Sequence, residues 1–343
     1  ATELLPDEVM RRARGAGMSC YPTGFDHGTI TVRNGPVLAE ITTLREDVVT
    51  DGRRAEVRFG TDWKADAMRR DFTINALYAD GEGGLFDPLD GFDDLLAGRV
   101  RFIGEPDQRI GEDRLRVFRF FRFTAAIAHE EFDPGGLAAC QRAAGNLGNL
   151  SAERVGAEMI RILGQPRIAA TLAMMTKTGV MAFDVSDLVA MARYEDETQS
   201  PVVSARLAIL MGHLSPEYFR DSWRLSNSLI REAGEVRHTA ELMNRGALHE
   251  AAYRHGRLAY VALPVAAAIG DWTGEQLAEV RDFWQQVQVP PFPIDGKDLM
   301  AQGFEQGPRL GKALRAAEAD WIRSGFQLDR EALLTRLSDH LSR

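Results

Sequence analysis

Cysteine is scarce in this chain, with only Cys20 and Cys140 among 343 residues. Two distant cysteines exclude a disulfide framework, and neither has the Cys or His spacing of a zinc site. No apolar run approaches the ~20 residues of a membrane-spanning helix, and the N-terminus lacks the basic start of a secretory signal. The sequence therefore predicts a soluble protein of the reducing cytoplasm, with no membrane partner.

An excess of basic residues is also missing, because the formal net charge is -9. This balance does not by itself suggest a nucleic-acid partner, since binding to phosphates needs a local positive potential. Residues 97–123 provide one, with seven arginines against four acidic residues. The length of the chain exceeds what one hydrophobic core usually organises, so we expect two or more domains.

The first part of the chain predicts a short amphipathic helix over residues 4–14 and then a small sheet. Residues 29–33 and 37–44 are rich in β-branched side chains, and Asn34-Gly35 between them is a strong hairpin signal. Glu40 falls within the second strand, where a carboxylate either faces water at a sheet edge or binds a cation or a donor. Residues 45–65 are polar and predict a mobile loop.

The stretch RRDFTINAL, which begins at Arg69 and Arg70, carries the most specific chemistry. Adjacent arginines offer forked donors that suit phosphate oxygens. Asp71 and Asn75 would share one face of a helix, where they could hold a ribose hydroxyl or a base edge. For an arbitrary RRD triplet, a capping aspartate with solvated arginines is the better interpretation. The length and order of this motif favour a nucleotide site instead.

A long helix is predicted to start at Glu112, with Asp113 beside it at the positive N-terminal end. Glu112, Arg116 and Arg119 would form one stripe of this helix, opposite an apolar side that can pack. A salt bridge between Glu112 and Arg116, worth roughly 0.3 to 0.5 kcal/mol, is the simplest explanation of the stripe.

The rest of the chain predicts helices. A short strand is expected at residues 99–103, and Ser151 is a helix cap. From residue 160 onward the periodicity is helical, without a further strand signal. Residues 293–311 predict two short helices around a glycine-rich turn that could expose backbone N–H groups to a phosphate. The fold class is therefore α+β, a small N-terminal sheet followed by helices.

These ordered motifs resemble those of the class II tRNA nucleotidyltransferase and bacterial poly(A) polymerase family. In that family the RRDFTINAL motif recognises the sugar and triphosphate of the incoming nucleotide, and an EDxxR motif matches the edges of cytosine and adenine. The resemblance implies nucleotide-binding roles for Arg69, Arg70, Asp71, Asn75, Glu112, Asp113, Arg116 and Arg119. Among these, Asp113 and Arg116 would choose the base, and Arg119 would reach the triphosphate.

The resemblance also implies a domain order. It predicts a nucleotidyltransferase head at residues 1–85, a helical neck with base recognition at 86–165, a helical body at 166–290 and a tRNA-contacting tail at 291–343. Lys297, in the tail segment, is the predicted RNA contact.

The family's reaction belongs to the two-metal type, in which carboxylates hold Mg²⁺ ions that activate a 3′-hydroxyl. Family members carry an Asp-x-Asp pair just before a start like Ala1-Thr2-Glu3, and no such pair precedes the predicted sheet here. Glu40 would be a third metal ligand and would assist catalysis. We therefore expect this chain to start after the pair and to be inactive alone, and its longer parent to be active.

The predicted function of the parent is template-independent addition of CCA to tRNA 3′ ends from CTP and ATP. Poly(A) polymerase shares these motifs, but the polar loop around Asp51-Gly52-Arg53 favours the CCA reaction, because switching between two bases requires such an element. A non-catalytic RNA-binding protein that lost the metal ligands is a second alternative. A start codon at Ala1 with no Asp-x-Asp encoded upstream would support it.

Overall fold

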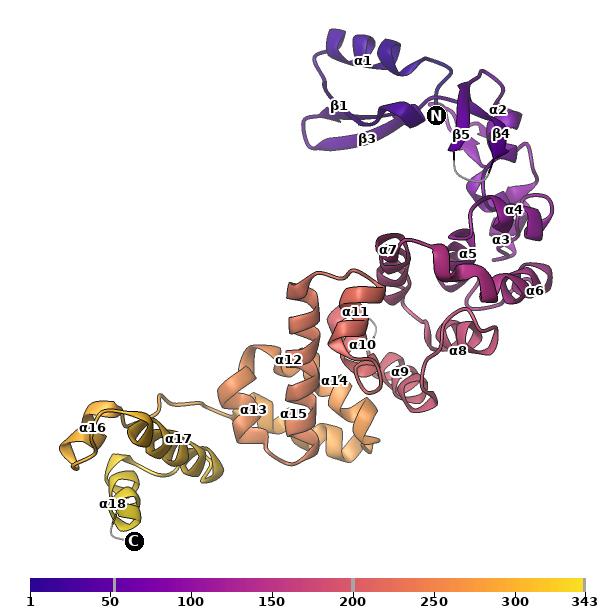
Figure 1. Ribbon diagram of the computed structural model, residues 1–343. Coiled ribbons are helices and arrows are strands. Elements are labelled where there is room, and N and C mark those ends of the chain that lie inside the picture. The colour runs from indigo at the N-terminus through magenta and orange to yellow at the C-terminus, as the bar shows by residue number, and fades with distance from the viewer. Residues whose placement is uncertain (52–53, 199–200, 342–343) are drawn as a thin grey trace. The chain divides into compact units, whose positions relative to one another are not determined.

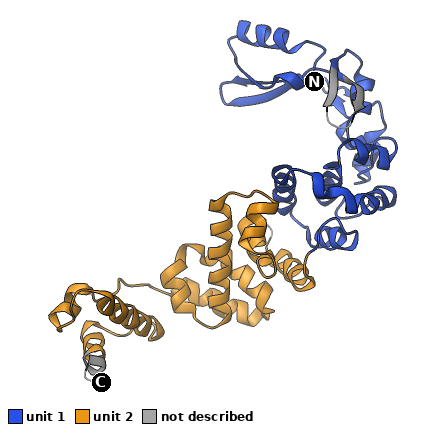
Figure 2. Ribbon diagram, viewed as in Figure 1, with its two compact units in different colours: residues 1–182 blue, residues 183–343 orange. Residues whose placement is uncertain are grey.

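The computed structural model describes residues 1–51, 54–198 and 201–341. It forms two compact units, residues 1–182 and residues 183–343 (Figure 2). The described chain is mostly helical, and its strands lie in the first unit, which confirms the predicted α+β class. The four predicted domains divide the chain more finely, and that division stays a prediction.

The first unit opens with a helix packed on a three-stranded antiparallel sheet (Figure 1). These elements are α1 (Pro6–Gly15), β1 (Ser19–Gly24), β2 (Thr29–Asn34) and β3 (Val37–Thr42). Val9, Ala13, Ile30 and Val32 are the buried residues between them. The predicted hairpin joins β2 to β3, and its two-residue loop begins at Gly35, whose φ of +57° suits glycine.

The predicted loop over residues 45–65 is wrong. Two strands, β4 (Arg45–Asp51) and β5 (Arg54–Phe59), pair as an antiparallel hairpin, and α2 (Trp63–Met68) follows. The β-branched run at residues 48–50 favours a strand, although the polar residues around it hide the signal in the sequence. Gly52 and Arg53 of the predicted switching loop lie outside the described residues.

After α2 the chain passes through the 3₁₀ turn η2 (Thr73–Asn75), the short hairpin β6 (Tyr78–Ala79) and β7 (Leu85–Phe86), and α3 (Gly91–Leu96). The strand predicted at residues 99–103 is wrong, because only Phe102 forms a bridge, to Phe72. The rings of Phe72 and Phe102 lie 4.8 Å apart in a buried aromatic cluster. The apolar residues at this position therefore reflect burial against aromatic side chains rather than a sheet.

Gly91, the first residue of α3, lies against the backbone of η2. A Cβ at this position would stand 2.1 Å from the carbonyl oxygen of Thr73. The hydroxyl of Thr73 in turn donates to the buried carboxylate of Asp94 at 2.6 Å. The start of α3 and the turn that contains Thr73 therefore fit together only with glycine at position 91.

The long helix predicted to start at Glu112 is two helices. α4 (Pro106–Glu112) ends where the prediction placed a start, Asp113 is extended with φ -146° and ψ 106°, and α5 (Arg116–Ile127) follows. The Asp113 side chain accepts a hydrogen bond from the Leu115 backbone N–H at 3.0 Å, which stabilises the break. The residues expected on the apolar side are buried, as predicted: Leu115, Val117, Phe118 and Phe121.

Helices account for the rest of the described chain. The first unit ends with α6 (Pro134–Ala143), α7 (Ala152–Leu163) and α8 (Ala169–Lys177). The second unit contains α9 (Val185–Glu197), α10 (Val203–Leu210), α11 (Pro216–Ser222), α12 (Asn227–Asn244), α13 (Leu248–His255), α14 (Ala259–Gly270), α15 (Gly274–Gln286), α16 (Gly296–Ala301), α17 (Pro308–Arg323) and α18 (Arg330–Leu341). Ser151 caps α7 as predicted. Within the described ranges, no helix is long and apolar enough to cross a membrane.

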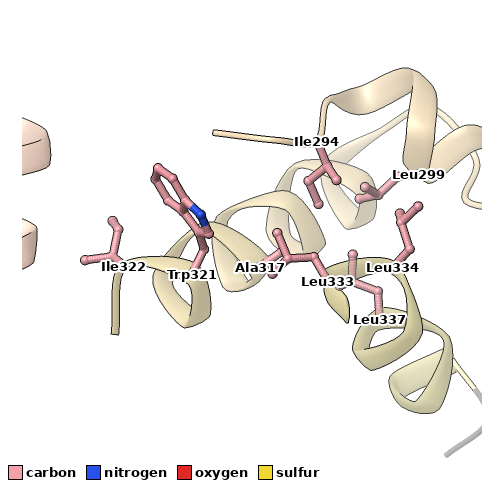
Figure 3. Close-up of a cluster of buried hydrophobic side chains, with 8 residues drawn as sticks. All are labelled: Ile294, Leu299, Ala317, Trp321, Ile322, Leu333, Leu334 and Leu337. Carbon is pink, nitrogen blue, oxygen red and sulfur yellow. The ribbon is translucent and has the colours of Figure 1, made fainter. Parts of the chain in front are cut away.

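The last helices, α16 to α18, enclose a core of their own (Figure 3). Its buried members are Ile294, Leu299, Ala317, Trp321, Ile322, Leu333, Leu334 and Leu337. Of the two short helices predicted around the glycine-rich turn, α16 is short but α17 has 16 residues. The longer helix is needed to bring Ala317 and Trp321 into this core.

We predict that Trp321→Ala destabilises these helices by about 3–5 kcal/mol, because Trp321 is 1% exposed and its removal leaves a cavity. Hydrogen exchange of the α17 amides would show the loss of protection. Met300→Ala, which truncates a side chain that is 44% exposed on α16, is the control and should change little. Equal protection of α17 in both variants would contradict the assignment of this core.

Candidate functional site

The RRDFTINAL stretch forms a loop between α2 and β6 that contains the turn η2. Asp71 is only 6% exposed, and its Oδ1 accepts hydrogen bonds from the Phe72 backbone N–H at 3.0 Å and from Asn75 Nδ2 at 2.9 Å. The two side chains that were expected to act together therefore meet. They do so across a turn rather than along a helix.

Both arginines of this loop bind one carboxylate, that of Asp66 on α2. Arg69 donates from Nε and Nη2 to Oδ1 at 2.9 and 2.7 Å, and Arg70 donates from the same two nitrogens to Oδ2 at 3.2 and 3.0 Å. Asp66 was missed in the sequence. Its spacing, three and four residues before the arginines on a helix, is the signal that would have found it.

Three arginines from α4 and α5 hold the same loop. Arg109 donates to the backbone carbonyls of both loop arginines. Arg116 donates from Nη2 to the Arg69 carbonyl at 3.2 Å, and Arg119 donates from Nε to Asp71 Oδ2 at 2.5 Å. Residues far apart in the sequence are thereby brought into one site, in which Arg109 is a member that sequence reasoning missed.

Glu112 and Asp113, the acidic pair of the EDxxR motif, bind different arginines. Glu112 accepts from Arg116 at 2.6 Å and also pairs with Arg109, so the salt bridge considered from the sequence is present. Asp113 instead pairs with Arg154 of α7, at 2.7 Å. Because the chain bends at Asp113, the single helical stripe expected for these residues does not form.

Two predicted site residues belong to other elements, and no hydrogen bond between described residues joins them to this cluster. Glu40 is exposed on β3, in register with Thr31 of β2. Lys297 is exposed in the first turn of α16, in the second unit. Over the described part of the chain, no three His, Cys, Asp or Glu side chains are grouped so that they could hold a metal ion. The described residues therefore do not form a two-metal centre around Glu40.

Burial and neighbouring charges shift the pKa values of the site in opposite directions. Burial raises the pKa of the Asp71 carboxyl, but Arg119 and the hydrogen bonds from Asn75 and Phe72 outweigh it, so that the pKa lies below its usual range. The pKa of Asp66 is lowered in the same way, by its arginines against burial. These carboxylates are therefore charged at neutral pH.

Forked arginine donors on a loop that is fixed by carboxylates suit the recognition of a phosphorylated ligand. Comparison with known proteins agrees with a site for a phosphorylated ligand. A family model described as Poly A polymerase head domain matches residues 1–101. A model for tRNA nucleotidyltransferase domain 2 matches residues 197–337.

Individual relatives extend the match over nearly the whole chain. The human CCA tRNA nucleotidyltransferase 1, mitochondrial, is 32% identical over 98% of this chain and 80% of its own length. A CCA-adding enzyme of Limosilactobacillus fermentum is 29% identical, covering 91% of this chain and 81% of the relative. The Bacillus stearothermophilus CCA-adding enzyme in complex with CTP has a TM-score of 0.78 at 25% identity, over 99% of this chain and 87% of that one. The chain belongs to the tRNA nucleotidyltransferase and poly(A) polymerase family.

We predict that Asp71→Asn makes the stability of the first unit less dependent on pH in the acid range. Because the folded-state pKa of Asp71 is lowered, its charge stabilises the fold above the unfolded value of about 3.9, and this contribution disappears as the pH falls through the folded value. Thermal midpoints of the unchanged protein and the variant, measured from pH 7 into the strongly acid range, should differ by a constant amount above about pH 4 and draw together below it. A difference that stayed constant over the whole range would contradict the role assigned to the charge.

Proposed function

We propose that this protein adds CCA to the 3′ ends of tRNA, using CTP and ATP without a nucleic-acid template. The observation that carries this is the 32% identity to the human CCA tRNA nucleotidyltransferase along 98% of the chain. Support comes from the site, in which the loop of Arg69 and Asp71 is joined to the helices of Arg116 and Arg119. A phosphate-binding loop and a base-recognising motif are thereby held together in one unit.

In this proposal different residues bind the phosphates, the sugar and the base of the nucleotide. Arg69 and Arg70 face the phosphates, and Asp71 with Asn75 positions the sugar. The next four, Glu112, Asp113, Arg116 and Arg119, form the base and triphosphate side of the pocket. Mutual hydrogen bonding fixes most of these side chains before a ligand arrives, which reduces the cost of ordering them on binding.

Several further assignments are part of the proposal. The reaction uses a divalent cation, proposed to be Mg²⁺, with Glu40 as the residue of this chain offered as a ligand and catalytic group. Lys297 is proposed to contact the tRNA, within a tail at residues 291–343 that follows a head at 1–85, a neck at 86–165 and a body at 166–290. The proposed location is the cytoplasm, although the human relative is named as mitochondrial.

Incorporation of single nucleotides separates the candidate functions. We expect the full natural gene product, given tRNA that ends before CCA, to add two residues with CTP alone, none with ATP alone, and CCA with both. Runs of A with ATP alone would overturn the CCA assignment in favour of poly(A) addition. Retained tRNA binding without any incorporation would favour the non-catalytic RNA-binding alternative.

We predict that Asp113→Ala and Arg116→Ala reduce the preference for CTP and ATP over UTP and GTP more than they reduce tRNA affinity. A bidentate match to a base edge contributes about 1–3 kcal/mol of discrimination, so preferences should fall roughly tenfold or more. Competition among the four nucleotides in the incorporation assay measures this. Arg142→Ala, which breaks the exposed pair with Asp107, is the matched control. If both site variants kept the unchanged preference among the four nucleotides, Asp113 and Arg116 would have a structural role only, as members of salt bridges.

A further inference from the structure

Asp66 is a buried carboxylate, with 1% of its surface exposed, beside the RRDFTINAL loop, which we call the nucleotide loop. We propose that Asp66 is a positioning residue for the triphosphate: its carboxylate holds Arg69 and Arg70 in the orientation in which they meet the phosphates. This inference rests on the proposed function, because it concerns the same nucleotide pocket. Asp66 lies outside the RRDFTINAL and EDxxR motifs, and the inference assigns it to the triphosphate part of the nucleotide.

The hydrogen bonds determine which edge of Arg69 is presented. Its Nε and Nη2 both donate to Asp66, and in the described structure its Nη1 has no partner. A planar guanidinium whose Nε and Nη2 edge is held by two bonds to one carboxylate oxygen can direct only its other edge to a ligand. The Arg69 side chain is 17% exposed, so part of it is open to solvent.

Arg70 is held on both edges. Besides its two bonds to Asp66, it donates from Nη1 to the backbone carbonyl of Asn75 at 2.8 Å, and its guanidinium lies over the ring of Tyr78, 5.0 Å from the centroid. Its side chain is still 31% exposed. Arg70 therefore brings charge to the loop in a fixed position, and Asp66 is the anchor that it shares with Arg69.

A carboxylate is needed here for electrostatic reasons. Two guanidinium groups on adjacent residues repel each other, and both are largely removed from water. One shared carboxylate offsets this repulsion and satisfies four N–H donors. Without its charge, the partly buried arginines gain by turning toward solvent, since an unpaired buried charge is costly. A ligand would then have to reorder both side chains as it binds.

Asp66 is itself fixed by a further donor. The Tyr78 hydroxyl donates to its Oδ2 at 2.8 Å, and the Tyr78 ring packs edge-on against Trp63 with 5.0 Å between centroids. Burial and the bond to Asp66 together raise the pKa of Tyr78 to about 12, so the hydroxyl remains a donor throughout the neutral range. The carboxylate thus has a single orientation, set by α2 and β6.

The test is equilibrium binding of CTP and CMP to the full chain and to Asp66→Asn, by calorimetry at fixed ionic strength. In the unchanged protein the phosphates should make CTP bind more tightly than CMP. We expect Asp66→Asn to weaken CTP binding about tenfold, as for the loss of charged hydrogen bonds, with CMP binding nearly unchanged. In an Arg69→Ala background the same substitution should have a smaller further effect, because one of the two arginines through which Asp66 acts is already absent.

Glu158→Gln is the matched control. Glu158 is also buried and pairs with two arginines, Arg122 and Arg161, at 2.7 Å each, neither of which is assigned to the phosphates. This variant should lower the thermal midpoint and leave the ratio of CTP to CMP affinity unchanged. A loss of the ratio in Glu158→Gln as large as that in Asp66→Asn would overturn the proposal.

The remaining outcomes are separable. If the unchanged protein does not prefer CTP to CMP, the proposed function fails, and the inference with it. If it does, and Asp66→Asn keeps the preference or weakens both ligands equally, only the role of Asp66 is overturned. Should Asp66→Asn fail to fold, Tyr78→Phe removes the hydroxyl that orients the carboxylate. It should reduce the CTP preference in the same direction, and an unchanged preference would overturn the proposal.

Discussion

Guanidinium groups from α4 and α5 bind the backbone carbonyls and the carboxylate of a loop that lies 39 to 48 residues earlier in the chain. The site depends on this long-range contact. The loop has only one short 3₁₀ turn of its own, so local hydrogen bonds such as that from Asn75 to Asp71 fix only part of its course. Arg109 and Arg116 supply the partners that a regular helix or strand would have supplied, and Arg119 orients Asp71. The nucleotide loop is therefore a property of the folded unit rather than of its own sequence.

These ion pairs also give the arginines of residues 97–123 a different role from the one expected from the sequence. Its excess of arginine was expected to attract phosphate. In the structure most of that charge is neutralised by carboxylates, many of them from outside the region, in pairs that join Arg99 and Arg101 to Asp94, Arg109 and Arg116 to Glu112, Arg119 to Asp71, and Arg122 to Glu158. The arginines primarily assemble the unit, and only donors left free by these pairs remain for a ligand.

Sequence reasoning succeeded where chemistry or periodicity was local. It found the β2–β3 hairpin, the cap at Ser151 and the helical remainder. It failed where a neighbour distant in sequence decides the outcome. The break at Asp113 depends on a side chain that turns back on the backbone and pairs with Arg154, and Phe102 belongs to an aromatic cluster rather than to a strand. Asp66 could have been found, because its partners lie one helical turn away.

The absence of a side chain at Gly91 restricts which substitutions this part of the protein can accept. Any side chain there would collide with the carbonyl of Thr73, whose hydroxyl is tied to Asp94. The Thr73 carbonyl is part of the backbone of the loop that carries Asp71 and Asn75, so this loop would have to move to relieve the collision. Divergence in the segment after the nucleotide loop is therefore restricted by the loop itself. A side chain at the first residue of α3 would therefore have to be accommodated by a shift of that loop.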